Sequence, residues 1–262
     1  MSGAAFNTVQ YVVLCAVSLA VVIKLARTSL AGRYKALLSF LFFMAFYYAV
    51  ILFFLEFRSG NFNSRAYMNF WEITQPLMWL FSVWMTLELY SLILERHKGL
   101  ATFGRWVQYA GLGLSTLISL VVMLPQFQSK GINPIALYYY SIDRGIDCGM
   151  LVFLLFILIW LTQYPVPLSR NVVVHSFVYS TLFFTNSLGM FTQMFFGFRL
   201  TQVLTSLLIG IFGLCLLAWL VLLTPKGEEI RVTVPRFSAE HEALVLEKLE
   251  TLNRTLLQIA RK

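Results

Sequence analysis

Ten side chains that could bind a small molecule stand within otherwise apolar stretches of this sequence. They are Glu72, Gln75, Trp79, Tyr140, Asp143, Arg144, Asp147, Asn186, Gln193 and Gln202. Polar and ionisable groups at membrane depth are costly, so they usually face the interior of a helix bundle or a water-filled cavity. The three carboxylates against one guanidinium leave a surplus of negative charge. Such a surplus suits a small ligand that is cationic or donates hydrogen bonds.

Helical spacing places these side chains on shared faces. Asp143 and Asp147 are one helical turn apart, and Arg144 lies about 100° around the same helix. Four helices then contribute polar groups to one level, which predicts a ligand pocket between helices. In the alternative interpretation, Glu72 and the three charged residues near 145 form an ion-pair and hydrogen-bond network that only fixes helix packing.

Two further ionisable residues, Glu88 and His175, fall at the opposite ends of their stretches from these ten side chains. A carboxylate–imidazole pair there could relay protons or lock an inactive state. The alternative is that each side chain reaches the membrane interface or a backbone partner.

Seven apolar stretches must position these residues. The chain is 59% hydrophobic and only 12% charged, with a mean hydropathy of +0.75, whereas soluble domains carry about 25% charged residues. A helix needs about 20 mostly apolar residues to cross a bilayer. The stretches that qualify are Ala5–Ala26, Ala36–Glu56, Phe70–Leu94, Trp106–Leu124, Ile135–Gln163, Val172–Phe196 and Leu200–Thr224. We therefore predict an all-α, multi-pass membrane protein whose residues 1–225 form a seven-transmembrane-helix bundle, in the plasma or inner membrane.

The basic residues predict the orientation of this bundle. One set of connecting segments holds Lys24, Arg27, Arg33, Lys35, Arg96, Lys98, Arg105, Arg170, Lys226, Arg231 and Arg236, and the other holds only Arg58, Arg65, Lys130 and Arg199. Segments rich in Lys and Arg stay in the cytoplasm. The N-terminus is therefore predicted outside and the C-terminus inside. This orientation puts the ten polar side chains in the outer half of the membrane, and Glu88 and His175 in the inner half.

The remaining residues, 226–262, are predicted to form a cytoplasmic tail with an amphipathic or coiled-coil helix at about 239–260. Its apolar seam repeats with spacings of four and three: Val245, Leu249, Leu252, Leu256 and Ile259. Such a seam favours docking, either on a cytoplasmic protein partner or on a second copy in a homodimer. The alternative is an amphipathic helix that lies on the inner membrane surface.

No catalytic, metal-binding or phosphate-binding motif is found, so we expect neither a cofactor nor a metal, and we do not expect an enzyme. The net charge of +8 comes from short clusters between apolar stretches, which is the pattern of membrane topology rather than of nucleic-acid binding. The sequence favours a sensor or receptor-like protein with an outward-facing pocket. Its alternatives are a small transporter or channel that uses the same polar layer, and an accessory subunit of a larger membrane complex.

Overall fold

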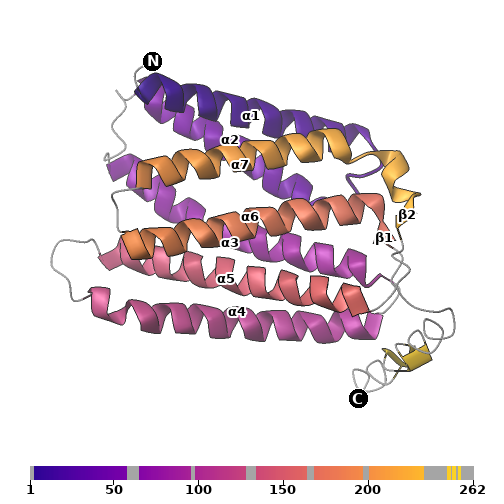
Figure 1. Cartoon of the computed structure of the whole chain (residues 1–262). Helices are drawn as coiled ribbons and strands as arrows, with labels where there is room; N and C mark the ends of the chain where they lie inside the picture. The colour runs from indigo at the N-terminus through magenta and orange to yellow at the C-terminus, as the bar shows by residue number, and fades with distance from the viewer. Residues whose placement is uncertain are drawn as a thin grey trace. The chain divides into compact units, whose positions relative to one another are not determined.

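Helices dominate the structure, a computed structural model (Figure 1). It describes residues 3–57, 65–95, 98–127, 134–163, 168–196 and 201–232, together with six tail positions between 247 and 254. Within this part of the chain there are seven α-helices: α1 Gly3–Arg27, α2 Lys35–Phe57, α3 Arg65–Ile93, α4 Lys98–Phe127, α5 Pro134–Gln163, α6 Arg170–Phe196 and α7 Thr201–Leu222. The helical class is therefore confirmed, and each predicted apolar stretch corresponds to one helix.

Four of these helices are long and apolar enough to cross a membrane, judged over the described residues. The qualifying segments are Thr8–Arg27 of α1, Lys35–Phe54 of α2, Arg65–Ile93 of α3 and Val203–Leu222 of α7. The helices α4, α5 and α6 span 30, 30 and 27 residues, and over the described residues they are not among these four. The structure thus supports a helical membrane protein, while the number of seven crossings and their orientation stay predictions.

The chain divides into two compact units. Unit 1 comprises Met1–Met85 and Leu188–Pro225, and unit 2 comprises Thr86–Ser187 and Lys226–Lys262. Both boundaries fall inside helices, so α3 and α6 each contribute one part to unit 1 and the other part to unit 2.

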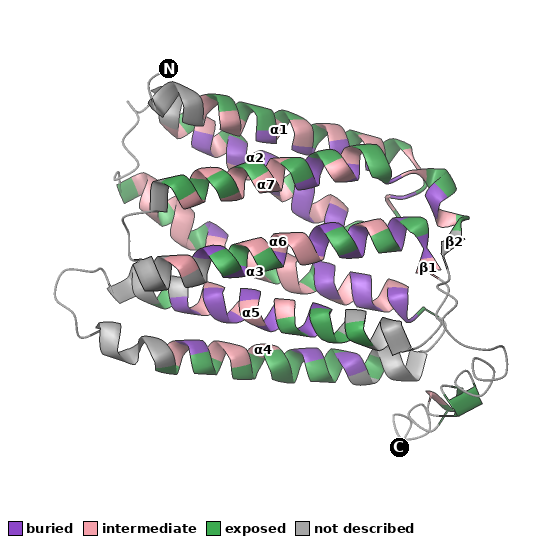
Figure 2. Ribbon diagram, viewed as in Figure 1, coloured by how far each residue is buried: buried purple, intermediate pink, exposed green. Residues whose placement is uncertain are grey.

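In unit 1, α1 packs beside α2 and α7. Its buried face repeats every three or four residues, with Leu14, Ser18, Val21 and Leu25 at 3% exposure or less (Figure 2). This period is that of one face of an α-helix. The other faces of α1 expose apolar side chains such as Val12, as expected of a helix surrounded by lipid.

Aromatic rings join α2 to its neighbours within unit 1. The ring of Phe40 lies edge-on, with centroids 6.4 Å from Phe81 of α3 and 6.5 Å from Phe212 of α7. Tyr47 stacks on Phe70 of α3 at 5.6 Å. Edge-to-face and offset contacts of this kind are the favoured geometries of aromatic pairs. The many Phe and Tyr residues of the sequence therefore form part of an interior, besides any lipid-facing role.

A single lysine joins the ends of α1 and α7. Lys24 is in the last turn of α1, and its Nζ donates a hydrogen bond to the main-chain carbonyl of Leu220. Leu220 belongs to the last turn of α7, where carbonyl groups lack a partner within the helix. The positive charge also matches the negative end of the helix dipole. Lys24 thus caps α7.

In unit 2, α4 and α5 lie side by side in close contact. A Cβ added at Gly145 of α5 would lie 2.6 Å from the Cα of Thr116, and one added at Gly149 would lie 3.2 Å from the Cβ of Ser115. Small residues spaced by four are what allows two membrane helices to approach so closely. A hydrogen bond also crosses this interface, from Ser115 Oγ to the main-chain carbonyl of Gly145 at 2.6 Å.

Candidate functional site

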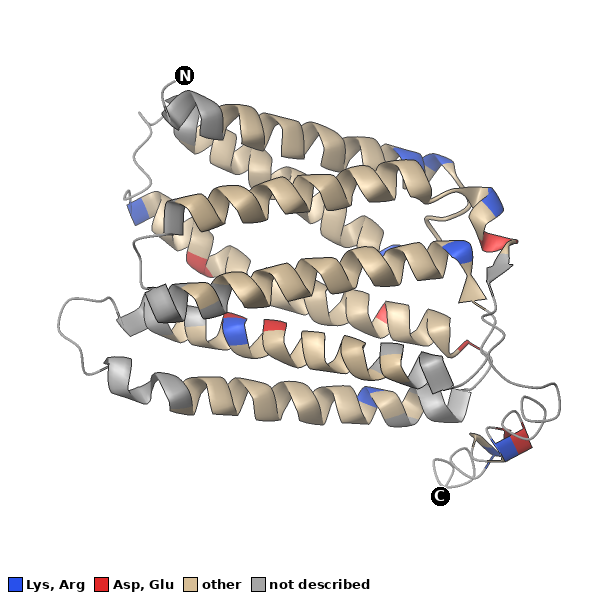
Figure 3. Ribbon diagram, in the orientation of Figure 1, with Lys and Arg blue, Asp and Glu red and all other residues tan. Residues whose placement is uncertain are grey.

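The charged residues of α5 cluster near its amino-terminal end, where Figure 3 shows acidic and basic segments next to each other. Arg144 and Asp147 are each only 7% exposed, and Asp143 is half-buried. Carboxylate and guanidinium groups are seldom buried this deeply unless they are hydrogen-bonded or bind something. This cluster is therefore the part of the predicted site for which the structure gives the most detail.

The guanidinium of Arg144 is directed at α4. Its Nε donates to the hydroxyl of Ser119 at 3.0 Å, and its Nη2 donates to the main-chain carbonyl of the same residue at 3.0 Å. The Ser119 hydroxyl in turn donates to the carbonyl of Ser141 at 2.6 Å. One serine thus accepts from the arginine and donates back to α5. This geometry supports the structural interpretation of Arg144, in which it links the two helices.

The other side of the cluster faces α6. The thiol of Cys148 lies beside the hydroxyl of Ser187 and close to the charges of Asp147 and Arg144. Ser187 is 2% exposed, so this contact is internal to unit 2. Hydroxyl, thiol and carboxyl groups therefore meet around the middle of α5. Such a set of groups can bind a cation or a hydrogen-bond donor.

The sequence interpretation missed the small residues that build this site. Ser115, Ser119 and Ser141 were read as part of apolar stretches, although their hydroxyl or carbonyl groups make the hydrogen bonds between α4 and α5. The signal was present as a spacing of four, from Ser115 to Ser119 and from Ser141 through Gly145 to Gly149. Such small-residue spacing is the known signature of close helix pairs in membranes.

Gln108 is a second polar residue that the sequence interpretation overlooked. It is 1% exposed on the face of α4 towards α5, and its Nε2 donates to the Met150 sulfur at 3.6 Å. On the same face, Gly104 lies so close to the ring of Tyr90 that a Cβ there would overlap it. Tyr90 in turn contacts Phe153 of α5 at 5.4 Å between centroids. This end of the helix pair is therefore a packed interior.

The predicted site residues of α3 belong to unit 1. Glu72, Gln75 and Trp79 are all half-buried. The helix continues through Pro76, although a proline has no N–H to donate to the carbonyl four residues earlier. That carbonyl belongs to Glu72. One turn of α3 thus combines a carboxylate, an amide and a freed main-chain acceptor.

Other predicted residues have different surroundings. Asn186 of α6 is exposed, so in this chain alone its amide does not lie in an interior. The side chains of Tyr140, Gln193 and Gln202 lie outside the described residues. The single pocket predicted from all ten residues stays a prediction, since its members on α3 and α5 belong to different units.

The predicted inner pair lies within unit 2. His175 is fully buried, and its ring packs against Tyr179 with centroids 5.7 Å apart. Tyr179 continues this row with an edge-on contact to Phe183 at 4.7 Å. Glu88 is half-buried, and its main-chain carbonyl accepts a hydrogen bond from Ser91. A relay or lock between Glu88 and His175 stays a prediction.

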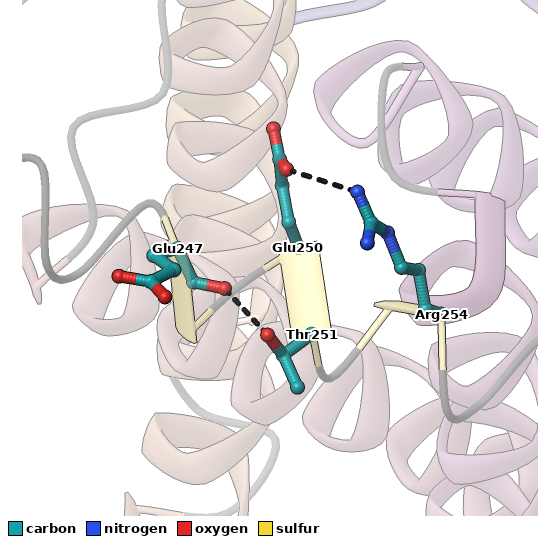
Figure 4. Close-up of polar contacts among 4 residues, drawn as sticks. All are labelled: Glu247, Glu250, Thr251 and Arg254. Atoms are coloured by element: carbon teal, nitrogen blue, oxygen red, sulfur yellow. Dashed lines mark hydrogen bonds and ion pairs between the residues drawn. The ribbon is translucent and has the colours of Figure 1, made fainter.

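The six described positions between 247 and 254 are helical, and all of them except Asn253 are exposed (Figure 4). Arg254 pairs with Glu250 at 3.7 Å, and the Thr251 hydroxyl donates to the Glu247 carbonyl at 2.9 Å. Both contacts join residues four apart, as in a helix. The seam residues Val245, Leu249, Leu252, Leu256 and Ile259 lie outside the described residues. Their docking role stays a prediction.

The comparisons with known proteins found no match: no protein-family model, no curated protein and no solved structure is similar to this chain. Over the described residues, no group of three or more His, Cys, Asp or Glu side chains could hold a metal ion.

Proposed function

We propose that this chain is a membrane sensor or receptor-like protein that binds a small cationic or hydrogen-bond-donating ligand beside Asp143 and Asp147. The observation that carries the proposal is the burial of Asp147, which is 7% exposed one helical turn from a second carboxylate. A buried carboxylate is stable only when a proton, a cation or several donors neutralise it. A ligand with a positive or donor group would supply this neutralisation and would thereby bind.

We further propose that all seven helices cross the membrane, with the N-terminus outside. The four strongly apolar helices support this, as do the lengths of α4, α5 and α6, which exceed the about 20 residues that a crossing requires. The basic residues of the α1 end, Lys24 and Arg27, lie in its last turn, as expected for a cytoplasmic end. Reporter fusions after Leu124, Gln163 and Thr224 should read outside, inside and inside. A fusion at Thr224 that reads outside would refute the orientation.

The ligand proposal is tested by thermal stability in the presence of small amines and guanidines. A ligand at about 100 times its Kd stabilises the folded state by about 2.7 kcal/mol, so a binding compound raises Tm. Asp147→Asn should abolish this rise in Tm. The Tm of the ligand-free variant should stay close to that of the ligand-free wild type. Glu229→Gln, at an exposed carboxylate, is the matched control and should keep the rise.

Three other outcomes would favour the alternatives. If Asp147→Asn lowers Tm and no amine or guanidine shifts the wild type, the carboxylates belong to a structural network. If the binding compound accumulates inside proteoliposomes, the protein is a transporter. If the purified chain is stable only together with a larger membrane complex, it is an accessory subunit.

A further inference from the structure

The segment that follows α7 returns to the amino-terminal end of α6. It consists of the short 3₁₀ helix η2, Pro225–Glu228, and of the strand β2, Arg231–Val232. Strand β2 pairs antiparallel with β1, Leu168–Ser169, which comes directly before α6. One more main-chain hydrogen bond, from Arg170 N to the Ile230 carbonyl at 3.0 Å, extends this pairing. The base of the C-terminal tail is thus held by main-chain contacts (Figure 1).

A side-chain contact strengthens the same junction. Asn171 is fully buried in the first turn of α6, and its Nδ2 donates to Oε1 of Glu228 at 2.8 Å. Ser169 accepts a hydrogen bond from Val172 N at 3.3 Å and so caps the helix. The carboxylate of Glu228 is also favoured there, because the amino-terminal end of a helix carries partial positive charge.

Gly227 makes this approach possible. A Cβ at this position would lie 2.8 Å from Cγ of Asn171, which is closer than real Cβ contacts come. Gly227 is also buried. Glycine therefore allows the main chain to pass directly over the buried amide, where any larger residue would push it away.

We propose that residues 226–232, the strap, tie the base of the tail to the amino-terminal end of α6, and that opening of the strap releases the tail. The strap is only seven residues long. The contacts described above are its two-residue strand pairing with β1, the main-chain bond between Arg170 and Ile230, and the hydrogen bond between Asn171 and Glu228. Short segments without the continuous hydrogen bonds of a long helix open more readily than the helices they rest on. A displacement of the first turn of α6 is then enough to free the tail. The proposal depends neither on a ligand nor on the orientation in the membrane.

Trypsin provides a direct test, because Lys226 and Arg231 are cleavage sites inside the strap. A protease needs an open, extended main chain, so the cleavage rate follows the population of the open strap. The full-length protein in lipid nanodiscs, which expose both faces, is compared with a synthetic peptide of residues 222–238. Cleavage after Arg231 should be at least about tenfold slower in the protein than in the peptide. Equal rates would overturn the proposal.

Two matched variants then test whether the hydrogen bond between Asn171 and Glu228 holds the strap. Glu228→Ala removes the acceptor of the Asn171 amide and should raise cleavage after Arg231 by about tenfold, as expected for the loss of one charged hydrogen bond. Glu229→Ala, one position further along at an exposed side chain, should leave the rate unchanged. If both variants cleave alike, the buried contact does not hold the strap.

A second pair of variants, at Gly227 and Gly32, tests the strap with a control for unfolding. Gly227→Ala should open the strap in the same assay, while Gly32→Ala, where an added Cβ meets nothing within 4 Å, should not. Cleavage after Arg254 in the exposed tail reports trypsin activity in every sample. Size-exclusion profiles identical to wild type are required of each variant that is scored. Gly227→Ala with a wild-type profile and a wild-type cleavage rate would also refute the strap.

Discussion

Arg144 of α5 donates two hydrogen bonds to one residue of α4, with Nε bound to the Ser119 hydroxyl and Nη2 to the Ser119 carbonyl, both at 3.0 Å. Arg144 is 7% exposed and both bonds are buried, so they are formed in an interior with little competition from water. Interior hydrogen bonds are individually stronger than surface ones, and the loss of one partner leaves the other desolvated. The pair Arg144 and Ser119 should therefore be a main determinant of the stability of the α4–α5 pair.

Ser119→Ala tests this role. It removes an acceptor of Arg144 and a donor to Ser141, so we expect unfolding to become easier by about 2 kcal/mol. Ser115→Ala removes only the bond to the Gly145 carbonyl and should cost about 1 kcal/mol. Tm in a mild detergent measures both. Equal losses for the two variants would show that the bond between Arg144 and the Ser119 hydroxyl adds no stability.

The close approach of α4 and α5 predicts an asymmetry between glycines. Gly145→Ala places a Cβ against the main chain of Thr116, and such overpacking typically costs about 1–3 kcal/mol. Gly113→Ala is the matched control on α4, since an added Cβ there meets nothing within 4 Å. Chemical denaturation in detergent should show a lower midpoint for the first variant and an unchanged or higher midpoint for the second. A lower midpoint for both would contradict close packing.

Lys24 predicts a capping effect in unit 1. Lys24→Met leaves the Leu220 carbonyl without its donor, and because the lysine is only partly buried we expect a loss of about 1 kcal/mol. Lys35→Met is the control, since it removes an equal charge from an exposed side chain. Tm should fall for Lys24→Met alone. A similar fall in Tm for both variants would mean that positive charge stabilises this end of α7, rather than the hydrogen bond from Lys24 to the Leu220 carbonyl.

The tail seam predicts docking. Replacing Leu249 and Leu256 together by Ser should split a homodimer, release a protein partner or detach the tail from the membrane, because a buried large aliphatic side chain contributes about 1.5–3 kcal/mol. The matched control replaces Glu247 and Arg254, two exposed residues with the same spacing of seven. Crosslinking and vesicle flotation distinguish the three results. A double Ser variant that behaves as the control in all of them would leave the tail as a solvated extension.

The sequence alone determined that the chain is helical, where its seven helices run, and which charged residues lie within them. Apolar length and composition carry this information, because a helix satisfies its own main-chain hydrogen bonds and its position needs no knowledge of its neighbours. The sequence could not select the buried face of α1, because apolar side chains such as Val12 lie on its exposed faces as well.

Only the tertiary structure decided what those residues contact. Spacing grouped Arg144 with Asp143 and Asp147, and the structure adds that its guanidinium bonds to Ser119, 25 positions away. Asn171 and Glu228 are 57 positions apart, and no local pattern relates them. Contacts of this range depend on which helix faces meet and on how closely glycines such as Gly145 and Gly227 let the main chains approach. The periodicity of one helix defines a face, but the packing of a second helix against it selects the partner.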